Sequence, residues 1–333
     1  MKAILMSQPG EVYTLRYADV PMPELSGANS MRVRLRAAGV NPVDAKLRKG
    51  GTYFPDKLPT ILGCDGAGVV ESVGAAVTRF KPGDAVYFCH GGIGGEPGNY
   101  AEFTVLHEDY AAALPKNLSF EQAAAVPLVL ITAWESLFER IALQHGQTVL
   151  IHAAAGGVGH VAVQLAQYAD ARIAATVGSA EKGELARRLG AEKIIDYTRE
   201  DFVQAALDWT AGKGVDVVFD TVGGATFQRS FAAAKVYGKI VTLLQSDCPP
   251  ADIKLARLRN QSIHFELMLT PMVLDMHDAR IAQRKILETG AKMIEDGQLE
   301  IIVNRILPLE QATLAHELIE AGHATGKTVL TMP

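Results

Sequence analysis

The feature that most constrains the fold is a glycine-rich turn that joins an apolar run to a helical pattern. Residues 148–151 have the composition of a buried strand, and residues 158–168 have the spacing of a helix packed on one face. Between them, residues 152–160 read HAAAGGVGH. Glycine lets a phosphate approach the backbone closely, and the first turn of a helix supplies unbonded N–H groups and a partial positive charge. The pattern predicts a dinucleotide-binding strand–turn–helix, with an ordinary tight turn as the alternative.

The small residues of this turn are spaced Ala153-x-x-Gly156-x-x-Gly159, with alanine in the first glycine position. A glycine motif alone is a weak signal, but its place between a strand and a helix strengthens it. We expect the cofactor pyrophosphate to contact the backbone of four residues: Ala155, Gly156, Gly157 and Val158.

The end of the next strand indicates which dinucleotide is bound. Residues 172–177 are β-like and lead into Gly178 and Ser179, with Lys182 shortly after. An NAD site usually has an acidic residue here to hold the ribose 2′-hydroxyl. A hydroxyl and an ammonium suit a 2′-phosphate better, so we predict NADPH. Glu181 opposes this interpretation, and a solvated lysine in the first turn of a helix is the alternative for Lys182.

From residue 147 onward, strand and helix patterns alternate. This alternation predicts an α/β fold with a doubly wound parallel sheet, in which ligands bind beyond the carboxyl ends of the strands. The expected strands are residues 148–152, 172–177, 193–196, 215–220, 239–244 and 263–267. The expected helices between them are residues 158–168, 181–189, 199–210 and 225–234.

The first part of the chain has a different character. Short β-like runs alternate with Gly- and Pro-rich turns up to about residue 120, which predicts a compact antiparallel barrel-like domain. A helical stretch, residues 130–141, precedes the alternating region. Residues 278–331 are expected to belong to the first domain again. We expect three segments: 1–122, 123–265 and 266–333.

Composition excludes several classes of partner. The net charge is −5 without a basic stripe, which argues against nucleic acid and anionic membranes as main partners. The longest apolar stretch, residues 123–134, is interrupted by Pro127 and is too short to span a bilayer. The three cysteines, Cys64, Cys89 and Cys248, are far apart, as expected of reduced thiols. We expect a cytoplasmic protein.

Several motifs together resemble the medium-chain dehydrogenase/reductase superfamily, and within it the zinc-independent quinone oxidoreductase (zeta-crystallin-like) branch. The similarity covers essentially the full chain. It rests on AGVNPVD at residues 38–44, LGCDGAGVV at 62–70, KPGDAV at 81–86, TAW at 132–134 and the glycine run within 146–164. The resemblance implies a GroES-like antiparallel β-barrel domain plus a Rossmann domain.

The same resemblance predicts that the chain binds no metal. Zinc alcohol dehydrogenases have Cys where this chain has Asn41, and a His-Glu pair where it has Cys64 and Asp65. Only Cys89 lies in the region where they carry four closely spaced cysteines. Without a Lewis acid, simple alcohols are difficult substrates, whereas quinones, enals and enones accept hydride readily.

Three residues are candidates for the catalytic side of the site. The Asn41 amide can donate to the acceptor oxygen or hold the nicotinamide, although a turn residue before Pro42 is the alternative. Asp44 supports Asn41 or the cofactor ribose, or else caps the helix of residues 45–49. Tyr53 matches a tyrosine that lines the quinone site in the family, and a loop aromatic over the core is the alternative.

The resemblance also implies further cofactor contacts, at Thr132, Tyr197, Leu243, Leu244 and Lys327. Residues 265–272, rich in Met and Leu, form an expected apolar wall for the substrate or else core filler. The strand of residues 263–268 is apolar and would be an exposed edge if unpaired, so we expect a homodimer.

The leading hypothesis is an NADPH-dependent reductase of quinones or conjugated carbonyls, with a small-molecule substrate. A zinc-type alcohol dehydrogenase of the same superfamily and a non-catalytic NADPH-binding protein are the alternatives.

Overall fold

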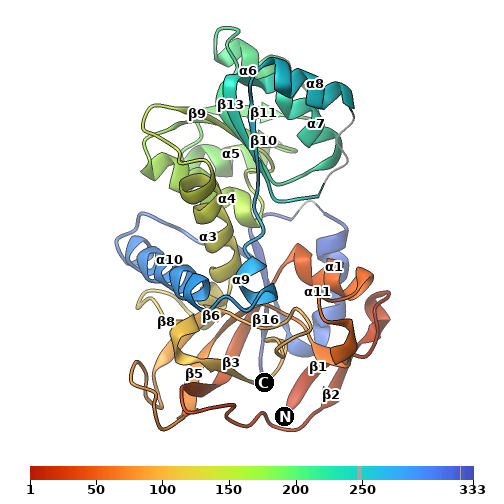
Figure 1. Ribbon diagram of the computed structural model, residues 1–333, viewed down its shortest axis with the longest axis vertical. Helices are drawn as coiled ribbons and strands as arrows, with labels where there is room; N and C mark the ends of the chain where they lie inside the picture. Colours follow the sequence, from red (N-terminus) through yellow and green to blue (C-terminus); the bar gives the residue numbers. More distant parts are fainter. Residues whose placement is uncertain (246–249, 323) are drawn as a thin grey trace. The chain divides into compact units, whose positions relative to one another are not determined.

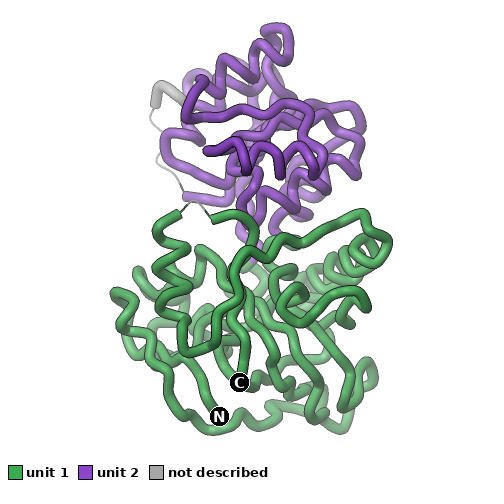
Figure 2. The backbone as a smooth tube through the Cα atoms, turned by 180° about the vertical axis from the view of Figure 1, so that it is seen from behind, with its two compact units in different colours: residues 1–131, 269–333 green, residues 132–268 purple. Residues whose placement is uncertain are grey.

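The computed structural model describes residues 1–245, 250–322 and 324–333. The chain forms two compact units (Figure 2). The first contains residues 1–131 and 269–333, and the second contains residues 132–268. The chain thus leaves the first unit, builds the second, and returns.

The second unit is built on a parallel sheet (Figure 1), whose strands have the order β11-β10-β9-β12-β13-β14. The order reverses at β9, which lies between β10 and β12, so this is the topological switch point at which such sheets bind ligands. The strands are β9 (Thr148–Ile151), β10 (Arg172–Val177), β11 (Lys193–Asp196), β12 (Val215–Asp220), β13 (Ala234–Thr242) and β14 (Ser262–Phe265). The predicted doubly wound α/β fold is confirmed.

The helices of this unit follow the strands in turn. They are α4 (Gly157–Tyr168), α5 (Ala180–Arg188), α6 (Phe202–Trp209), α7 (Gly224–Ala233) and α8 (Pro250–Leu258). Parallel strands are covered on both faces, so their residues are apolar throughout rather than alternating. Leu150 and Val218 from the sheet pack with Phe227 and Phe231 of α7 in one buried core.

The first unit is mainly antiparallel. One sheet has the order β2-β1-β4, and the other has the order β15-β16-β3-β5-β6-β8, with β7 also pairing β3. The strands are β1 (Lys2–Met6), β2 (Leu15–Asp19), β3 (Ser30–Val40), β4 (Thr60–Ile61), β5 (Asp65–Val73), β6 (Ala85–Cys89), β7 (Phe103–His107), β8 (Ala111–Ala113), β15 (Val303–Pro308) and β16 (Lys327–Thr331). The predicted antiparallel GroES-like sheet is confirmed.

Four short helices and one long helix, α10, complete this unit: α1 (Pro42–Gly50), α2 (Phe120–Ala124), α9 (Thr270–Val273), α10 (His277–Glu295) and α11 (Ala312–Glu320). Strand β16 pairs antiparallel with the end of β3, with Thr328 opposite Val40. This pairing brings the last residues of the chain to the residues that precede α1.

Several predicted elements differ from the observed ones in their bounds; β13, for example, spans Ala234–Thr242 where residues 239–244 were expected. The expected helix of residues 130–141 is an α-helix, α3 (Pro127–Trp134), followed by a wider π-helical segment, Glu135–Arg140. The segment is wider because the amide of Ile141 bonds the carbonyl of Ser136, five residues back. The last strand of the parallel sheet ends at Phe265 rather than at Leu267. In the described part of the chain, no helix is both long and apolar enough to cross a membrane.

Candidate functional site

The glycine-rich turn follows β9 at the switch point of the parallel sheet. Ala153, which replaces the first glycine of the motif, has a φ of 48°. A left-handed backbone at a non-glycine residue costs about 1–2 kcal/mol. The amide of Ala153 donates to the Thr176 hydroxyl at 3.2 Å, and the amide of Ala154 donates to the Thr176 carbonyl at 3.1 Å. Thr176 on β10 therefore holds the turn in this strained shape.

Gly159 allows the helix to start close against the turn. A Cβ on Gly159 would lie 2.8 Å from the Cα of Ala154 and would collide with the carbonyl oxygen of Ala153. Only glycine fits at this position without moving backbone. The third glycine of the motif is thus required by packing between α4 and the turn.

The first turn of α4 presents backbone donors at the carboxyl end of β9. The amide of His160 makes the first bond back to the Gly156 carbonyl, at 3.0 Å. The N–H groups of Gly157, Val158 and Gly159 precede that bond, so no carbonyl of the helix is available to them. Donors at the positive end of a helix of this length fit a pyrophosphate.

The residues predicted to select the cofactor lie together at the ends of β10 and β11. Ser179 caps α5, and its hydroxyl accepts from the amide of Lys182 at 3.3 Å. Tyr197 follows β11, and its hydroxyl packs so closely over Gly178 that a Cβ there would collide with it. The structure therefore brings Gly178, Ser179 and Tyr197 together, and Lys182 follows in the first turn of α5. Ser179 has a capping role that the motif analysis did not assign.

Two polar residues that the sequence analysis missed shape the loop after β13. The Asp220 carboxylate, at the end of β12, accepts from the Thr242 hydroxyl at 2.8 Å and from the Gly223 amide at 3.0 Å. The amide of Leu243 bonds the Asp220 carbonyl at 3.1 Å, and that of Leu244 bonds the Thr242 hydroxyl at 3.3 Å. Asp220 and Thr242 thus fix the backbone of both predicted leucines. The sequence signal that could have identified Asp220 is its place as an acidic residue at the end of a predicted strand.

Buried His152 has a structural role beside the glycine turn. Its Nδ1 lies 3.1 Å from the Thr176 hydroxyl, and its Nε2 lies 3.1 Å from the Ser230 hydroxyl. Burial lowers the pKa of His152 to about 4, so the ring is neutral at pH 7.

Thr132, which was predicted to contact the cofactor, is a buried residue of α3.

In the first unit, Asn41 and Asp44 open helix α1. Asn41 is the N-cap, Pro42 follows it, and the Asp44 carboxylate accepts from the Asn41 amide at 2.8 Å. Asp44 is therefore the third helical residue of a capping box rather than the cap itself. The alternative in which Asp44 caps residues 45–49 is wrong, because the helix starts at Pro42.

Asp44 is fully buried and has one strong partner besides the Asn41 amide. The Tyr100 hydroxyl donates to its Oδ2 at 2.8 Å, and its Oδ1 lies without a hydrogen-bond partner among the described residues. Burial raises the pKa of Asp44 to about 7, even though both hydrogen bonds favour the charged form. The carboxyl group therefore titrates near neutral pH.

The side chain of Asn41 lies in a buried polar cluster with Asp65 and Lys327. Its Nδ2 donates to Asp65 Oδ2 at 2.9 Å, and its Oδ1 accepts from the Lys327 ammonium. The ammonium also faces the Val40 carbonyl at 3.2 Å and Asp65 Oδ2 at 3.3 Å. Lys327, predicted from the family to contact a cofactor phosphate, thus directs its donors at three oxygens of the first unit.

Glycine makes room for this cluster. A Cβ on Gly39, in the AGVNPVD motif, would lie 2.9 Å from Asp65 Oδ2 and would collide with the Ala124 carbonyl. Burial raises the pKa of Asp65, and the Lys327 charge opposes that shift. The sequence identified Asp65 only as a departure from the zinc ligands, and no local signal connects it with Lys327.

Tyr53 lies beside a hollow in the first unit. Its amide bonds the Ile93 carbonyl at 3.2 Å, and Ile93 lines a pocket of about 340 Å³. Phe54 and Met272 also line it, together with Lys57, Gly91, Gly95, Glu96, Val273, Asp275 and Arg280. Met272 belongs to the apolar segment expected to form a substrate wall. Phe54, next to Tyr53, and Met272, from the predicted apolar segment, therefore line one pocket of ligand size within the first unit.

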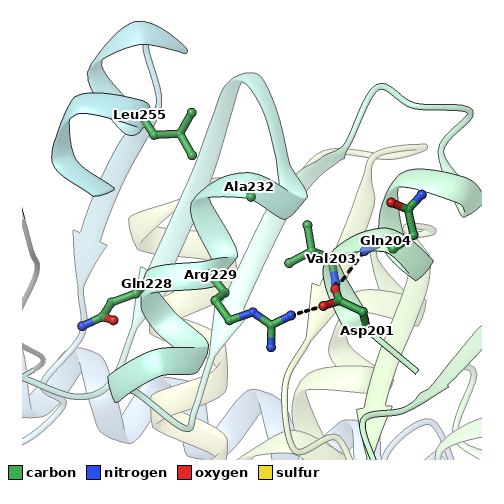
Figure 3. A pocket seen from close by; sticks show the side chains of 7 residues that line it. All are labelled: Asp201, Val203, Gln204, Gln228, Arg229, Ala232 and Leu255. Carbon is green, nitrogen blue, oxygen red and sulfur yellow. Dashed lines mark hydrogen bonds and ion pairs between the residues drawn. The ribbon is translucent and has the colours of Figure 1, made fainter. Parts of the chain in front are cut away.

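The second unit has another hollow, of about 480 Å³, lined by residues of α6, α7 and α8 (Figure 3). Asp201 and Arg229 form an ion pair in it, and the Asp201 carboxylate also accepts from the amides of Val203 and Gln204. The carboxylate is thus engaged in capping α6. This hollow lies on helices rather than at the carboxyl ends of the strands, and it holds none of the predicted site residues.

The described residues contain no group of three or more His, Cys, Asp or Glu side chains placed to hold a metal ion. Cys64 and Cys89 are both buried and free. Cys248 lies outside the described residues. In the polar cluster of Asn41, Asp65 and Lys327, the oxygen of Asn41 and one oxygen of Asp65 already bind the Lys327 ammonium. These oxygen atoms therefore do not fit as ligands of a zinc ion.

Two families of known proteins match the chain. Residues 27–116 match the alcohol dehydrogenase GroES-like domain, and residues 189–330 match the family described as zinc-binding dehydrogenase. Together they cover parts of both units.

Full-length relatives match as well. The chain is 36% identical over 329 residues to a quinone oxidoreductase of Pseudomonas aeruginosa, covering 99% of each chain. It is 34% identical to the NADPH-dependent alkenal/one oxidoreductase, chloroplastic, of Arabidopsis thaliana, covering 99% of this chain and 79% of the relative. The crystal structure of Escherichia coli quinone oxidoreductase complexed with NADPH superposes with a TM-score of 0.88 at 29% identity, covering 99% of this chain and 100% of that one.

Proposed function

This chain belongs to the medium-chain dehydrogenase/reductase superfamily, in its quinone oxidoreductase branch, and from that premise we propose an NADPH-dependent, zinc-independent enzyme that reduces quinones or α,β-unsaturated carbonyls. That the chain is an oxidoreductase follows from its full-length relatives. The proposal concerns the cofactor, the metal independence and the class of acceptor.

The cofactor proposal rests on how the second unit fits NADPH. The donors of Gly157, Val158 and Gly159 suit the pyrophosphate, and Ser179 with Lys182 suits the 2′-phosphate. Bound NADPH would supply the hydride. The residues of the chain bind and orient the cofactor. Asp220 and Thr242 hold the backbone of Leu243 and Leu244, and Thr176 holds the glycine turn.

The single observation that carries the acceptor class is the Asn41 cluster. A catalytic zinc needs three protein ligands and an open position. Here two of the corresponding positions, Asn41 and Asp65, hold an amide and a carboxylate that both bind the Lys327 ammonium. With no metal to lower the pKa of an alcohol, the site suits acceptors that take hydride without Lewis-acid help. A neutral amide donor at Asn41 stabilises the oxygen charge that develops in such acceptors.

This arrangement disfavours the zinc-type alcohol dehydrogenase, because at two of its ligand positions Asn41 and Asp65 bind one another. The third hypothesis, a non-catalytic NADPH-binding protein, is disfavoured by the named oxidoreductases that match the full chain.

The test is a stopped-flow screen of NADPH oxidation by the purified protein. Quinones, enals and enones are compared with saturated aldehydes of matched chain length. We expect turnover with the first group and little with the second. The Asn41→Ala variant should lose roughly 10²–10³-fold in kcat while its Kd for NADPH changes much less. Equal turnover of saturated and conjugated substrates would contradict the acceptor class.

A further inference from the structure

The Asn41 side chain is held at both ends of its amide. Its oxygen accepts from the Lys327 ammonium, and its nitrogen donates to the Asp65 carboxylate at 2.9 Å. Both partners are buried, with side-chain exposures of 3% for Lys327 and 0% for Asp65. In this environment charge-assisted hydrogen bonds are strong and geometrically demanding.

These two contacts determine which way the amide faces. If the amide rotated by half a turn, its NH₂ group would face an ammonium and its oxygen would face a carboxylate. Both bonds would be replaced by repulsive contacts between like partners, at a site from which water is excluded. Asn41 is therefore restricted to one orientation, in which one Nδ2 hydrogen binds Asp65. The proposed function assigns the second Nδ2 hydrogen to the acceptor or the nicotinamide.

The two partners of the Asn41 amide, Lys327 and Asp65, have their own hydrogen bonds satisfied. The Lys327 ammonium has three donors, and the three oxygens around it belong to Val40, Asn41 and Asp65. The second carboxylate oxygen of Asp65 accepts from the amide of Leu128 at 2.8 Å. The opposite charges of Lys327 and Asp65 compensate one another, so the pair can stay buried without a further counter-ion.

We propose that Lys327 and Asp65 are positioning residues that set the orientation of the Asn41 amide for the reaction. This role differs from a phosphate contact, since the Lys327 ammonium lies against Asn41. The inference rests on the proposed function, because it needs Asn41 to act on the acceptor or the nicotinamide.

The experiment is a double-mutant cycle on the full-length enzyme. Lys327→Met removes the ammonium and keeps the length of the side chain. We expect kcat for a good quinone or enone to fall about 10–100-fold, because a misoriented donor loses most of its benefit in the transition state. We expect kcat/KM to fall by the same factor, and the Kd for NADPH to stay within about twofold of wild type. In the Asn41→Ala background, Lys327→Met should cause almost no further loss.

Conservative and matched variants separate positioning from folding. Lys327→Arg keeps a charged donor and should recover part of kcat. Lys49→Met, at an exposed lysine of α1, should leave kcat unchanged. If Lys327→Met does not fold because it leaves Asp65 unpaired, the Asp65→Asn/Lys327→Met pair removes both charges together and takes its place in the cycle.

The outcomes are distinct. If wild type does not oxidise NADPH with any conjugated acceptor, the proposed function fails. If wild type is active and Asn41→Ala is not, but folded Lys327→Met retains full kcat, the positioning role is wrong. Independent, additive losses from Asn41→Ala and Lys327→Met would also overturn it.

Discussion

Asp44 is a residue whose burial and charge oppose each other. Its carboxyl group accepts two hydrogen bonds, from Asn41 and Tyr100, yet burial raises its pKa to about 7. Asp65 is a second buried acid nearby, and Lys327 is the neighbouring cation. The folded protein therefore holds a proton on Asp44 at a pH where the unfolded chain has lost it.

This proton makes stability depend on pH in a defined direction. Between about pH 4 and 7 the folded state binds one proton more than the unfolded state at this site, so its contribution falls as the pH rises and is flat above about pH 7. Asp44→Asn cannot ionise. We expect its urea midpoint, relative to wild type, to rise from pH 4.5 to pH 7.5. A difference that is constant across this range would show that Asp44 titrates normally. Buried histidines with lowered pKa values contribute equally to both proteins and cancel.

Lys182 carries the prediction for cofactor choice. We expect wild type to bind NADPH at least tenfold more tightly than NADH. Lys182→Ala should weaken the binding of NADPH by about 1.5–3 kcal/mol and the binding of NADH by much less, because only NADPH has the 2′-phosphate. Fluorescence titration with both cofactors measures this. Arg188→Ala, at the exposed end of the same helix, is a control. Equal dissociation constants in wild type would refute the assignment.

Among the elements, helix α4 depends most on the absence of a side chain. Gly159→Ala places a Cβ against the Ala153 carbonyl and 2.8 Å from the Ala154 Cα, so the helix start or the turn must move. We expect a loss of about 1–3 kcal/mol in stability and weaker NADPH binding. Gly50→Ala, where a Cβ meets nothing within 4 Å, is the matched control in a thermal-shift assay. A Gly159→Ala protein with wild-type Tm and Kd would contradict the close packing seen here.

Strand β14 is the element for which we predict a partner. It is the last strand of the parallel sheet and pairs with β13 on one side, and Phe265 is 68% exposed. An apolar edge of this kind favours pairing with a second copy across a two-fold axis. We propose a homodimer through β14. Light scattering should give twice the chain mass at micromolar concentration, and Phe265→Lys should shift it toward one chain. A wild-type mass of one chain would refute the dimer.

For the whole molecule, the prediction is that activity needs no metal. The Asn41, Asp65 and Lys327 side chains bind one another, so no open ligand set is available among them. Prolonged chelation should change neither Tm nor kcat, and elemental analysis should find no stoichiometric zinc. Loss of turnover on chelation that returns with added zinc would restore the zinc-type alternative.

The sequence by itself determined the features that depend on local backbone chemistry. The glycine spacing at Gly156 and Gly159 predicted the strand–turn–helix, because steric room and helix-end donors are set within a few residues. Alternating apolar runs and helical patterns predicted the parallel sheet, since burial on both faces requires them. The AGVNPVD motif identified Asn41 and Asp44 as candidates, although whether they act on a ligand remains a prediction.

Only the tertiary structure decided how these residues are held. Lys327 lies 286 positions after Asn41, and it reaches the amide because β16 pairs with the end of β3. Likewise Asp220 meets Thr242 because β12 and β13 are neighbouring parallel strands. Such contacts leave no local pattern, because strand pairing joins residues without regard to their separation along the chain. The candidate residues could be found from the sequence, whereas their orientation, burial and charge balance could not.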